Sequence, residues 1–287
     1  MITSRSQRWR ERRDTFVSGT TTIDPSRYAA DVVSCPAVAK PFVETHHYSG
    51  TFPASRLSVG LFANGPGRRS VLSRIATFSV PMNNAAVPKH AGRVRPNHGV
   101  ELGRFVLLDT VPGNGETWFL SRAFRLLRAG KPEIQSVIAY ADPMQRRGPS
   151  GEVIKPGHVG GIYAAFGAAY RGRTRPRTEL TEPSGTVVSE RALSKIRNDE
   201  RGAAYASEAL LERGAKRSPG ASGRAWVADL RASGWLRRRR HPGNHIYAFT
   251  LTKAARLAAR GLPALAYPVL DRNAAAADAT VLPLLAT

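Results

Sequence analysis

Two short apolar segments, each ending in an aspartate, constrain the fold most strongly. Residues 101–109 (Glu-Leu-Gly-Arg-Phe-Val-Leu-Leu-Asp) and 136–142 (Ser-Val-Ile-Ala-Tyr-Ala-Asp) are rich in large or β-branched apolar residues and are followed by turn residues, as buried strands are. An amphipathic run lies between them. Strand, helix and strand in this order predict a β-α-β unit with a right-handed crossover, so the two strands are expected to be adjacent and parallel.

The segment between the strands has the signals of a helix and of an anion-binding turn. Its apolar stripe includes Leu120, Phe124 and Leu127, and Asn114 is expected to cap the helix, which should end near Gly130. The preceding turn, residues 111–117, is rich in glycine, and free N–H groups at a helix start can bind an anion. The candidate cofactor-binding residues in this turn are Gly113, Asn114, Gly115 and Thr117.

The charge balance points to a polyanionic partner. The chain of 287 residues has 43 Lys and Arg against 21 Asp and Glu, a formal net charge of +22. A GC-rich genome could also inflate arginine and alanine, but the basic residues are clustered, which favours nucleic acid. The single Cys35 excludes internal disulfides, and neither a bilayer-length apolar run nor a signal-peptide pattern is present. We therefore expect a soluble protein of the cytoplasm, without a membrane partner.

Outside this unit the chain falls into segments of different character. Residues 1–38 are predicted to be a basic, poorly ordered N-terminal arm, and residues 39–182 an α/β core. In the core, residues 57–62 and 71–80 should pair as an antiparallel hairpin. The basic, proline-rich residues 83–99 show no pattern, and a DNA-facing loop and an idle loop both remain open. Residues 183–252 are expected to contact DNA, and residues 253–287 to form an alanine-rich tail.

An ordered set of short motifs resembles a known family. It consists of Glu101-Leu-x-Arg104, Asp109, Asn114, Tyr140-Ala-Asp-Pro143, Gly157-His158, Gly161-x-Tyr163 and Tyr170-x-Gly172. This set is similar to the Mom proteins of bacteriophages, which modify adenine in phage DNA and belong to the wider GNAT acyltransferase fold. The resemblance covers roughly His46 to Tyr247. It implies a GNAT-like mixed sheet flanked by helices, with a basic C-terminal extension of helices and a hairpin.

Several polar residues of the core are candidates for a catalytic site. From the residues alone, Arg104 could be part of a site or could join strands by pairing with Glu101, Asp109 or Asp142. Asp142 could cap a turn or face the crevice at the end of its strand. The resemblance implies catalytic roles for Arg104, Asp142, Tyr163 and His47, with His46 as the alternative to His47. Residues 157–172 are expected to form a loop and then a helix of small residues, with Tyr163 as the acid and Tyr170 in packing.

The cofactors are less determined. GNAT proteins hold the pyrophosphate of acyl-coenzyme A with a Gln/Arg-x-x-Gly-x-Gly/Ala loop, and residues 112–117 lack its leading Gln or Arg. An acyl-coenzyme A-like donor is therefore an open question, although an anionic group can still dock there. The family's product carries a carbamoylmethyl group on adenine N6, which implies a further activating device such as iron. The metal ligands that the resemblance implies are His47, Asp142 and His158.

Candidate DNA contacts lie in the second half of the chain. Arginines alternating with Gly and Pro at Arg171, Arg173 and Arg175 suit an extended backbone along phosphates. Helices are expected at residues 188–197, 203–213 and 224–232, followed by a hairpin over residues 235–251 with its turn at 242–244. This order resembles winged-helix modules in shape. The hairpin supplies the remaining candidates, namely Arg237, Arg238, Arg239, Arg240, His245 and Tyr247.

Three functions fit the sequence. The first is a transferase that modifies adenine N6 in double-stranded DNA, after flipping the base out of the stack, and thereby protects the DNA from restriction endonucleases. The second is a GNAT N-acetyltransferase acting on an amine or a protein, which the missing loop motif disfavours. The third is a catalytically inactive DNA-binding protein, which the clustering of Arg104, Asp142, His158 and Tyr163 disfavours. The sequence leaves the DNA target context and the oligomeric state open, a homodimer included.

Overall fold

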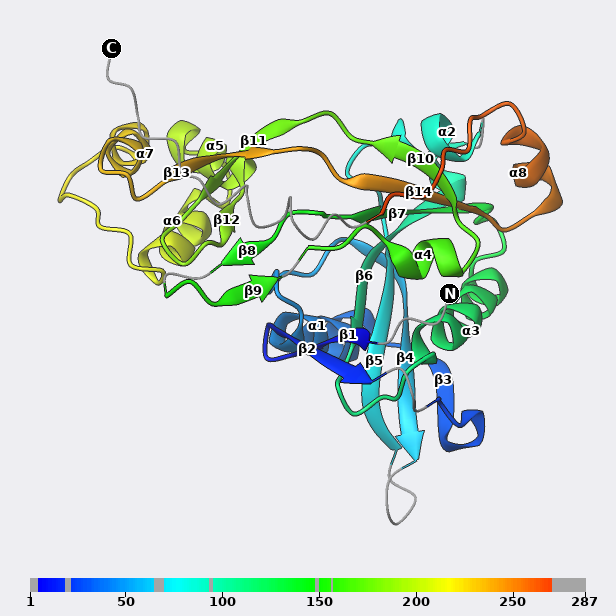
Figure 1. Cartoon of the computed structure of the whole chain (residues 1–287). Helices are drawn as coiled ribbons and strands as arrows, with labels where there is room; N and C mark the ends of the chain where they lie inside the picture. The colour runs from blue at the N-terminus through cyan, green and yellow to red at the C-terminus, as the bar shows by residue number, and fades with distance from the viewer. Residues whose placement is uncertain are drawn as a thin grey trace. The chain divides into compact units, whose positions relative to one another are not determined.

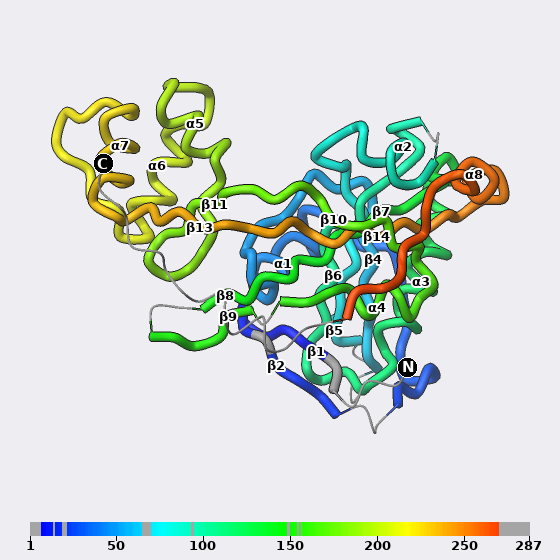
Figure 2. Tube along the Cα trace, turned by 45° about the horizontal axis from the view of Figure 1, so that its top comes forward, coloured from blue at the N-terminus to red at the C-terminus, as the bar shows by residue number. Residues whose placement is uncertain are grey.

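The computed structural model describes residues 5–18, 22–64, 70–92, 95–147, 150–155 and 157–269. The chain divides into two units, which Figures 1 and 2 trace from end to end. Unit 1 takes residues 1–144, 155–174 and 244–287, and unit 2 takes residues 145–154 and 175–243. These units differ from the predicted segments, because unit 2 is inserted into unit 1, and because part of the segment predicted as an arm lies in the main sheet.

Unit 1 is built on a seven-stranded sheet with the order β10-β14-β7-β6-β5-β4-β3. Its strands are β3 (Tyr28–Val33), β4 (Ser55–Asn64), β5 (Ser70–Ser79), β6 (Gly99–Leu107), β7 (Ser136–Ala141), β10 (Ala169–Arg173) and β14 (His245–Thr250). Every neighbouring pair is antiparallel except β6 and β7, which are parallel. The predicted parallel strand pair and the predicted β4–β5 hairpin are therefore confirmed.

Helices cover both faces of this sheet (Figure 1). One face packs against α3 (Gly115–Gly130) and α4 (Gly161–Ala165), and the other against α1 (Lys40–His46), α2 (Ala86–Ala91) and α8 (Lys253–Ala258). Shorter helical turns are η1 (Pro25–Arg27), η2 (Cys35–Ala39) and η4 (Pro96–His98). The alternation of a strand explains the division: Val137 and Ala139 belong to the α3 side, whereas Ile138 packs with α2.

The N-terminal segment is ordered where it was predicted to be a solvated arm. Strands β1 (Arg5–Arg10) and β2 (Arg13–Ser18) pair as an antiparallel hairpin. Trp9 is buried against Val43, Ile75 and Val106 and so packs the hairpin onto the α1 side of the sheet. The first four residues lie outside the described residues.

Two segments near the centre of the chain also differ from expectation. The predicted helix over residues 157–172 is limited to α4, and Tyr170 lies on strand β10. Gly167 ends the helical path because its φ of +80° belongs to the left-handed region that favours glycine. Residues 83–99, expected to lack structure, contain α2 and η4, with residues 93 and 94 outside the described part.

Unit 2 combines a three-stranded sheet, in the order β12-β11-β13, with three helices. Its elements are β8 (Arg146–Arg147), which pairs with β9 (Val153–Lys155), then β11 (Arg177–Thr181), β12 (Val187–Val188), α5 (Glu190–Asn198), α6 (Ala203–Leu211), α7 (Gly223–Ala232) and β13 (Arg237–His241). Trp226 is fully buried at the centre of its core. The three predicted helices are confirmed.

The predicted hairpin over residues 235–251 is wrong. Strand β13 pairs with β11 in unit 2, whereas β14 pairs with β7 and β10 in unit 1. The Pro242–Asn244 turn is therefore the point at which the chain passes from one unit to the other. Each strand is recruited by a partner distant in sequence, which a local turn signal does not reveal.

A β-bulge in β6 sets which side chains share a face. Thr77 of β5 is opposite Arg104, but the next residue, Phe78, is opposite Leu102, so Gly103 is an extra residue. The bulge shifts the alternation by one, and Glu101 and Arg104, three residues apart, therefore project from the same face. Gly103 is required here because a Cβ atom at this position would collide with Ser79 Oγ.

We expect Gly103→Ala to lower the free energy of unfolding by about 1–3 kcal/mol, the usual effect of overpacking a fitted site. Gly161→Ala is the matched control, because a Cβ atom there has open space and the position begins a helix. Urea unfolding of both variants measures the difference. Ser79→Ala, added to Gly103→Ala, should restore part of the lost stability. Equal stability of all the variants would show that the close approach of Gly103 to Ser79 does not maintain the bulge.

Candidate functional site

The parallel strands β6 and β7 pair over only three residues and then part. Gly99, Val100 and Glu101 are opposite Ser136, Val137 and Ile138, and no pairing follows although both strands continue. Polar side chains collect at this opening. Glu101 and Arg104 come from β6, and Tyr140 and Asp142 from β7 and the residue after it. All four are partly exposed, as the residues of an accessible site must be.

A buried ion pair lies at the end of β7. The Lys155 ammonium is fully buried, and its Nζ is 2.6 Å from Asp142 Oδ2. Lys155 Nζ also donates to the Asp142 carbonyl at 3.1 Å. The other carboxylate oxygen, Oδ1, accepts from the Met144 amide at 2.9 Å, and the His158 amide donates to the Asp142 carbonyl at 2.9 Å. Asp142 therefore caps the turn, which is one of the two roles that the sequence left open, and it also holds a charged partner.

Lys155 was missed by the sequence reasoning. The available signal was a lone lysine that follows Val153 and Ile154 in a short apolar run, where a buried cation needs a carboxylate. The lysine also contacts an aromatic ring, since its Nζ is 5.0 Å from the ring centroid of Tyr48. Tyr48 is a second residue that was not singled out.

The structure distinguishes the two adjacent histidines. His47 ends α1, and its Nδ1 is 2.8 Å from Ser49 Oγ. Burial lowers the pKa of His47 well below its ordinary value, and the nearby cations Arg104 and Lys155 lower it further. His46 instead accepts from the Glu11 amide, and the charges near it are Arg10, Glu11 and Asp109. His47 is thus the histidine that the structure brings to the polar cluster.

Arg104 makes none of the strand-joining ion pairs considered from the sequence. Its Nε donates to the Thr51 carbonyl at 2.9 Å and its Nη2 to Thr51 Oγ1 at 2.8 Å. Asp109 pairs with Arg10, and Asp142 pairs with Lys155. Burial raises the pKa of Glu101, and Arg104 opposes this shift. Arg104 therefore brings a positive charge to the opening. Among the described residues, no carboxylate contacts its guanidinium directly.

Tyr163 reaches the cluster from the other face of the sheet. It lies on α4 and is buried, with its ring 5.3 Å from that of Tyr247 and 6.5 Å from that of His158. Burial raises the pKa of Tyr163, and the electrostatic influence of Tyr48 and Glu101 raises it further. Because the strands part here, side chains from the two faces can meet.

The three metal ligands implied by the resemblance do not form a ligand group. Among the described residues, no three His, Cys, Asp or Glu side chains are close enough together to hold a metal ion. His47, Asp142 and His158 are therefore a poor fit as a set. The Lys155 ammonium also contacts the Asp142 carboxylate directly and so takes the place that a metal ion would occupy. We derive no chemical step through a metal.

The turn before α3 is occupied by side chains of the protein itself. Arg8 is fully buried and donates to the Val111 and Pro112 carbonyls and to Glu116, while Arg74 donates to the Gly115 carbonyl. The Gly113 carbonyl accepts from the Ile23 amide. Asn114 takes the N-cap position with a φ of +59°, but its side chain makes no capping hydrogen bond. Of the candidate cofactor residues, Gly113 and Gly115 thus have carbonyls that accept hydrogen bonds from other residues of the protein. Thr117 Oγ1 donates to the Asn114 carbonyl.

The candidate DNA-contacting arginines have different environments. Arg237, Arg238 and Arg240 are exposed on β13, as are Arg173 and Arg175 elsewhere in the chain. Arg239 is 3.3 Å from Glu179, a buried carboxylate that also pairs with Arg146 and Arg177. Arg171 donates to the carbonyls of His90, Leu262 and Pro263. Arg171 and Arg239 therefore have structural roles, and the exposed arginines are the ones that phosphate can reach.

His245 and Tyr247 are not on the surface, contrary to the expectation that they contact DNA. Both are buried on β14, the strand next to β7. His245 Nδ1 is 2.7 Å from the Tyr170 hydroxyl, and the Tyr247 hydroxyl donates to the Val159 carbonyl. The aromatic character of this strand reflects packing in the core of unit 1.

His245 should make stability depend on pH. Burial, and to a lesser degree Arg173, lower its pKa to about 4. The unfolded histidine binds a proton near pH 6.5, so the unfolding free energy should fall as the pH drops from 6.5 towards 4, by at most about 3 kcal/mol. His245→Gln can still hydrogen-bond Tyr170 and should reduce this dependence in urea titrations at several pH values, leaving the part that arises from the buried His158, whose pKa is also lowered to about 4. A His245 ring that titrates near pH 6.5 by NMR would contradict its burial.

Comparison with known proteins identifies the family. Residues 31–268 match the model of the Mom protein family, which is well over half of the chain, whereas no curated protein sequence matches it. In the described residues, no helix has both the length and the apolar character to cross a membrane. The match confirms the resemblance carried by the motifs around Arg104, Asp142 and Tyr163. The chain belongs to the Mom protein family, and this membership links it to DNA modification in phages.

Proposed function

We propose that this protein is a transferase that modifies adenine N6 in double-stranded DNA with a carbamoylmethyl-type group and so protects the DNA from restriction endonucleases. The observation that carries the proposal is the polar cluster at the opening between β6 and β7 in a chain of the Mom family. The members of this polar cluster are Arg104, Asp142, Lys155, Tyr163 and His47.

The topology supports a GNAT-like core. Four antiparallel strands, β3 to β6, are followed by the crossover helix α3 and the parallel strand β7, and a later strand, β14, enters between β7 and β10. The parallel pair separates after three residues, beside the bulge at Gly103. In such a sheet the separated strand ends form the crevice in which ligands bind.

Adenine N6 is a weak nucleophile, because its lone pair is delocalised into the ring, and it is stacked and paired within the duplex. The base must therefore be flipped out to reach the cluster. In the proposed reaction a carbon–nitrogen bond forms between N6 and the donor carbon, and the bond from that carbon to its leaving group breaks. Once the new bond has formed, the N6 proton is acidic, so even a carboxylate paired with a lysine can accept it. Asp142 is assigned this role.

The remaining residues act on the donor. The planar guanidinium of Arg104, fixed by two hydrogen bonds to Thr51, can bind a carbonyl or carboxylate oxygen of the donor. Tyr163 supplies the proton to the departing group, and burial keeps its phenol protonated by raising its pKa. His47 is assigned to hold the base or donor by hydrogen bonding, as a neutral imidazole.

A general GNAT acetyltransferase is the second candidate function. It would need a place for the coenzyme A pyrophosphate at residues 112–117. There Arg8 and Arg74 already bind the loop carbonyls, which makes the loop a poor receptor in this conformation. A DNA-binding protein without catalysis is the third, and it would need no cluster of buried charges such as Lys155 with Asp142.

Nucleoside mass spectrometry of plasmid DNA from cells expressing the protein tests the proposed function. The expected result is a deoxyadenosine with added mass at N6, together with resistance of the plasmid to restriction endonucleases. Cells with the empty vector are the control. Unmodified deoxyadenosine from phage-infected cells that contain the folded protein would contradict the proposal. An acetylated amine or protein product would favour the second candidate.

Conservative variants should separate chemistry from stability. Asp142→Asn and Tyr163→Phe keep shape while removing a charge or a hydroxyl, and Arg104→Lys loses the planar fork. We expect Tyr163→Phe and Arg104→Lys to stay folded, to bind DNA like the parent and to yield little or no modified adenine. Asp142→Asn should also lose activity, but it leaves the buried Lys155 without its carboxylate and should lower the melting temperature as well. Thermal melts, DNA titrations and nucleoside analysis on the same preparations measure this. Full modification by Asp142→Asn would remove Asp142 from the reaction, and a melting temperature that falls in step with activity in Tyr163→Phe or Arg104→Lys would indicate a structural role for that residue.

The exposed arginines of β13 should set the salt dependence of DNA binding. Arg238→Gln with Arg240→Gln should make the slope of log affinity against log salt shallower by about 0.9 for each phosphate that the variant no longer neutralises. Arg239→Gln is the matched control: its guanidinium is held by Glu179, so we expect a lower melting temperature and an unchanged slope. Equal slopes for the parent and the double variant would exclude these two arginines from the interface.

A further inference from the structure

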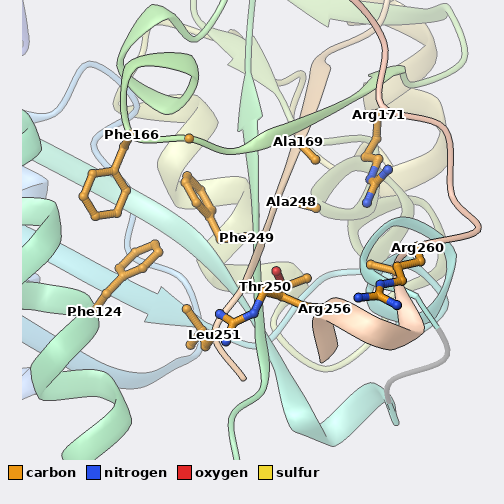
Figure 3. Close-up of a pocket in the computed structure, with 12 residues that line it drawn as sticks. Phe124, Phe166, Ala169, Arg171, Ala248, Phe249, Thr250, Leu251, Arg256 and Arg260 are labelled. Atoms are coloured by element: carbon orange, nitrogen blue, oxygen red, sulfur yellow. The ribbon is translucent and has the colours of Figure 1, made fainter. Parts of the chain in front are cut away.

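Unit 1 has a pocket that the proposed reaction does not use. It has a volume of about 420 Å³ and lies between the ends of β10 and β14, α3 and α8. Figure 3 shows that three phenylalanines line one side of it and that Arg171 and Arg260 line the other, with the Arg256 side chain extending towards Leu251. The residues that matter here are Phe124, Phe166, Phe249, Arg171, Arg256 and Arg260.

The phenylalanines form a continuous apolar wall. Phe124 meets Phe249 with the ring centroids 5.0 Å apart and meets Phe166 at 5.4 Å, both edge to face. Phe166 and Phe249 are 5.9 Å apart. Phe124 and Phe249 are buried, whereas Phe166 is partly exposed and offers ring surface to the pocket. Flat aromatic surface of this kind suits a planar ring, because ring stacking adds to the burial of area.

The arginines give the pocket a positive charge without a counter-charge. None of its lining residues is an aspartate or glutamate. Arg171 is held rigidly by three backbone carbonyls, at 2.9, 2.9 and 2.7 Å. Arg256 on α8 and Arg260 just after it are four residues apart, which is one helical turn, and both are exposed. Neither is in an ion pair with a carboxylate among the described residues. Three guanidinium groups around one hollow repel one another and favour a polyvalent anion.

We propose that this pocket binds a nucleotide, with its base against the partly exposed ring of Phe166 and its phosphate on Arg256 and Arg260. The combination of flat apolar wall and unneutralised arginines is the chemistry that recognises a planar base joined to a phosphate. The volume admits a single nucleotide and not a duplex. That nucleotide comes either from an unpaired position of a DNA strand or from a soluble mononucleotide. The site is separate from the polar cluster, and the inference goes beyond the proposed reaction.

Binding of deoxyadenosine monophosphate to the full chain, followed by calorimetry, tests the pocket. Arg256→Gln with Arg260→Gln should weaken binding at least about tenfold, because hydrogen bonds to charged groups are the strong ones. Phe166→Leu, which keeps the apolar volume but loses the flat ring, should also weaken it. Lys253→Gln is the matched control, since it removes an exposed cation of α8 that does not line the pocket. Thermal melts of all variants establish that they remain folded.

Three further probes decide what the pocket recognises. Deoxyadenosine, which lacks the phosphate, and inorganic phosphate, which lacks the base, should each bind more weakly than the monophosphate. A short single-stranded oligo(dA), tested with the same variants, distinguishes the two sources of the nucleotide. If the variants weaken binding of the oligonucleotide alone, the pocket belongs to a DNA strand. If they weaken binding of the mononucleotide, it belongs to a soluble ligand. The proposal is overturned if the arginine variant binds both probes like the parent, or if inorganic phosphate binds as well as the monophosphate and Phe166→Leu has no effect. Because binding is the readout, loss of DNA modification would not affect this result.

Discussion

The buried pair of Lys155 and Asp142 is the interaction on which the site depends. A lysine without solvent is tolerated only beside a carboxylate, and loss of one partner from such a pair typically destabilises a protein by about 3–5 kcal/mol. The same aspartate fixes the turn after β7 through the Met144 amide and accepts from the His158 amide. Burial lowers the pKa values of His47 and His158, and the positive charge of Lys155 lowers them further, while Asp142 opposes this effect at His158. One ion pair therefore sets the path of the chain and contributes to the protonation of the cluster.

The sheet supplies the place where this ion pair becomes useful. An unbroken sheet would keep the α1 side and the α3 side apart. Here β6 and β7 separate after Glu101, and the bulge at Gly103 turns Arg104 to the same face as Glu101. Tyr163, on α4, lies beside the residues that follow β7, with its ring 6.5 Å from that of His158. The proposed chemistry needs an acid, a proton acceptor and a fixed cation around one flipped base, and the separation of two strands brings them together.

The sequence predicted what local patterns determine. The parallel pair of strands, helix α3 and the three helices of unit 2 follow from apolar spacing and turn residues, and they were confirmed. Long-range pairing was not predictable in this way. Trp9 orders the N-terminal hairpin, β14 joins β7 instead of β13, and Lys155 finds its carboxylate across the end of a strand. His245 and Tyr247 illustrate the same limit, because an alternating aromatic strand looks alike on a DNA-binding surface and in a core.

Photo-crosslinking tests most directly whether the polar cluster receives the target base. A duplex that carries a photoreactive adenine analogue would be irradiated with the full protein, and the crosslinked peptide identified by mass spectrometry. We expect crosslinks within residues 140–144 or 157–163 of unit 1, or at Tyr48, and their disappearance when an unlabelled duplex with the same target competes. Crosslinks confined to unit 2, or to the residues around Phe166 and Arg256, would contradict the assignment of the opening between β6 and β7 as the place where adenine is modified.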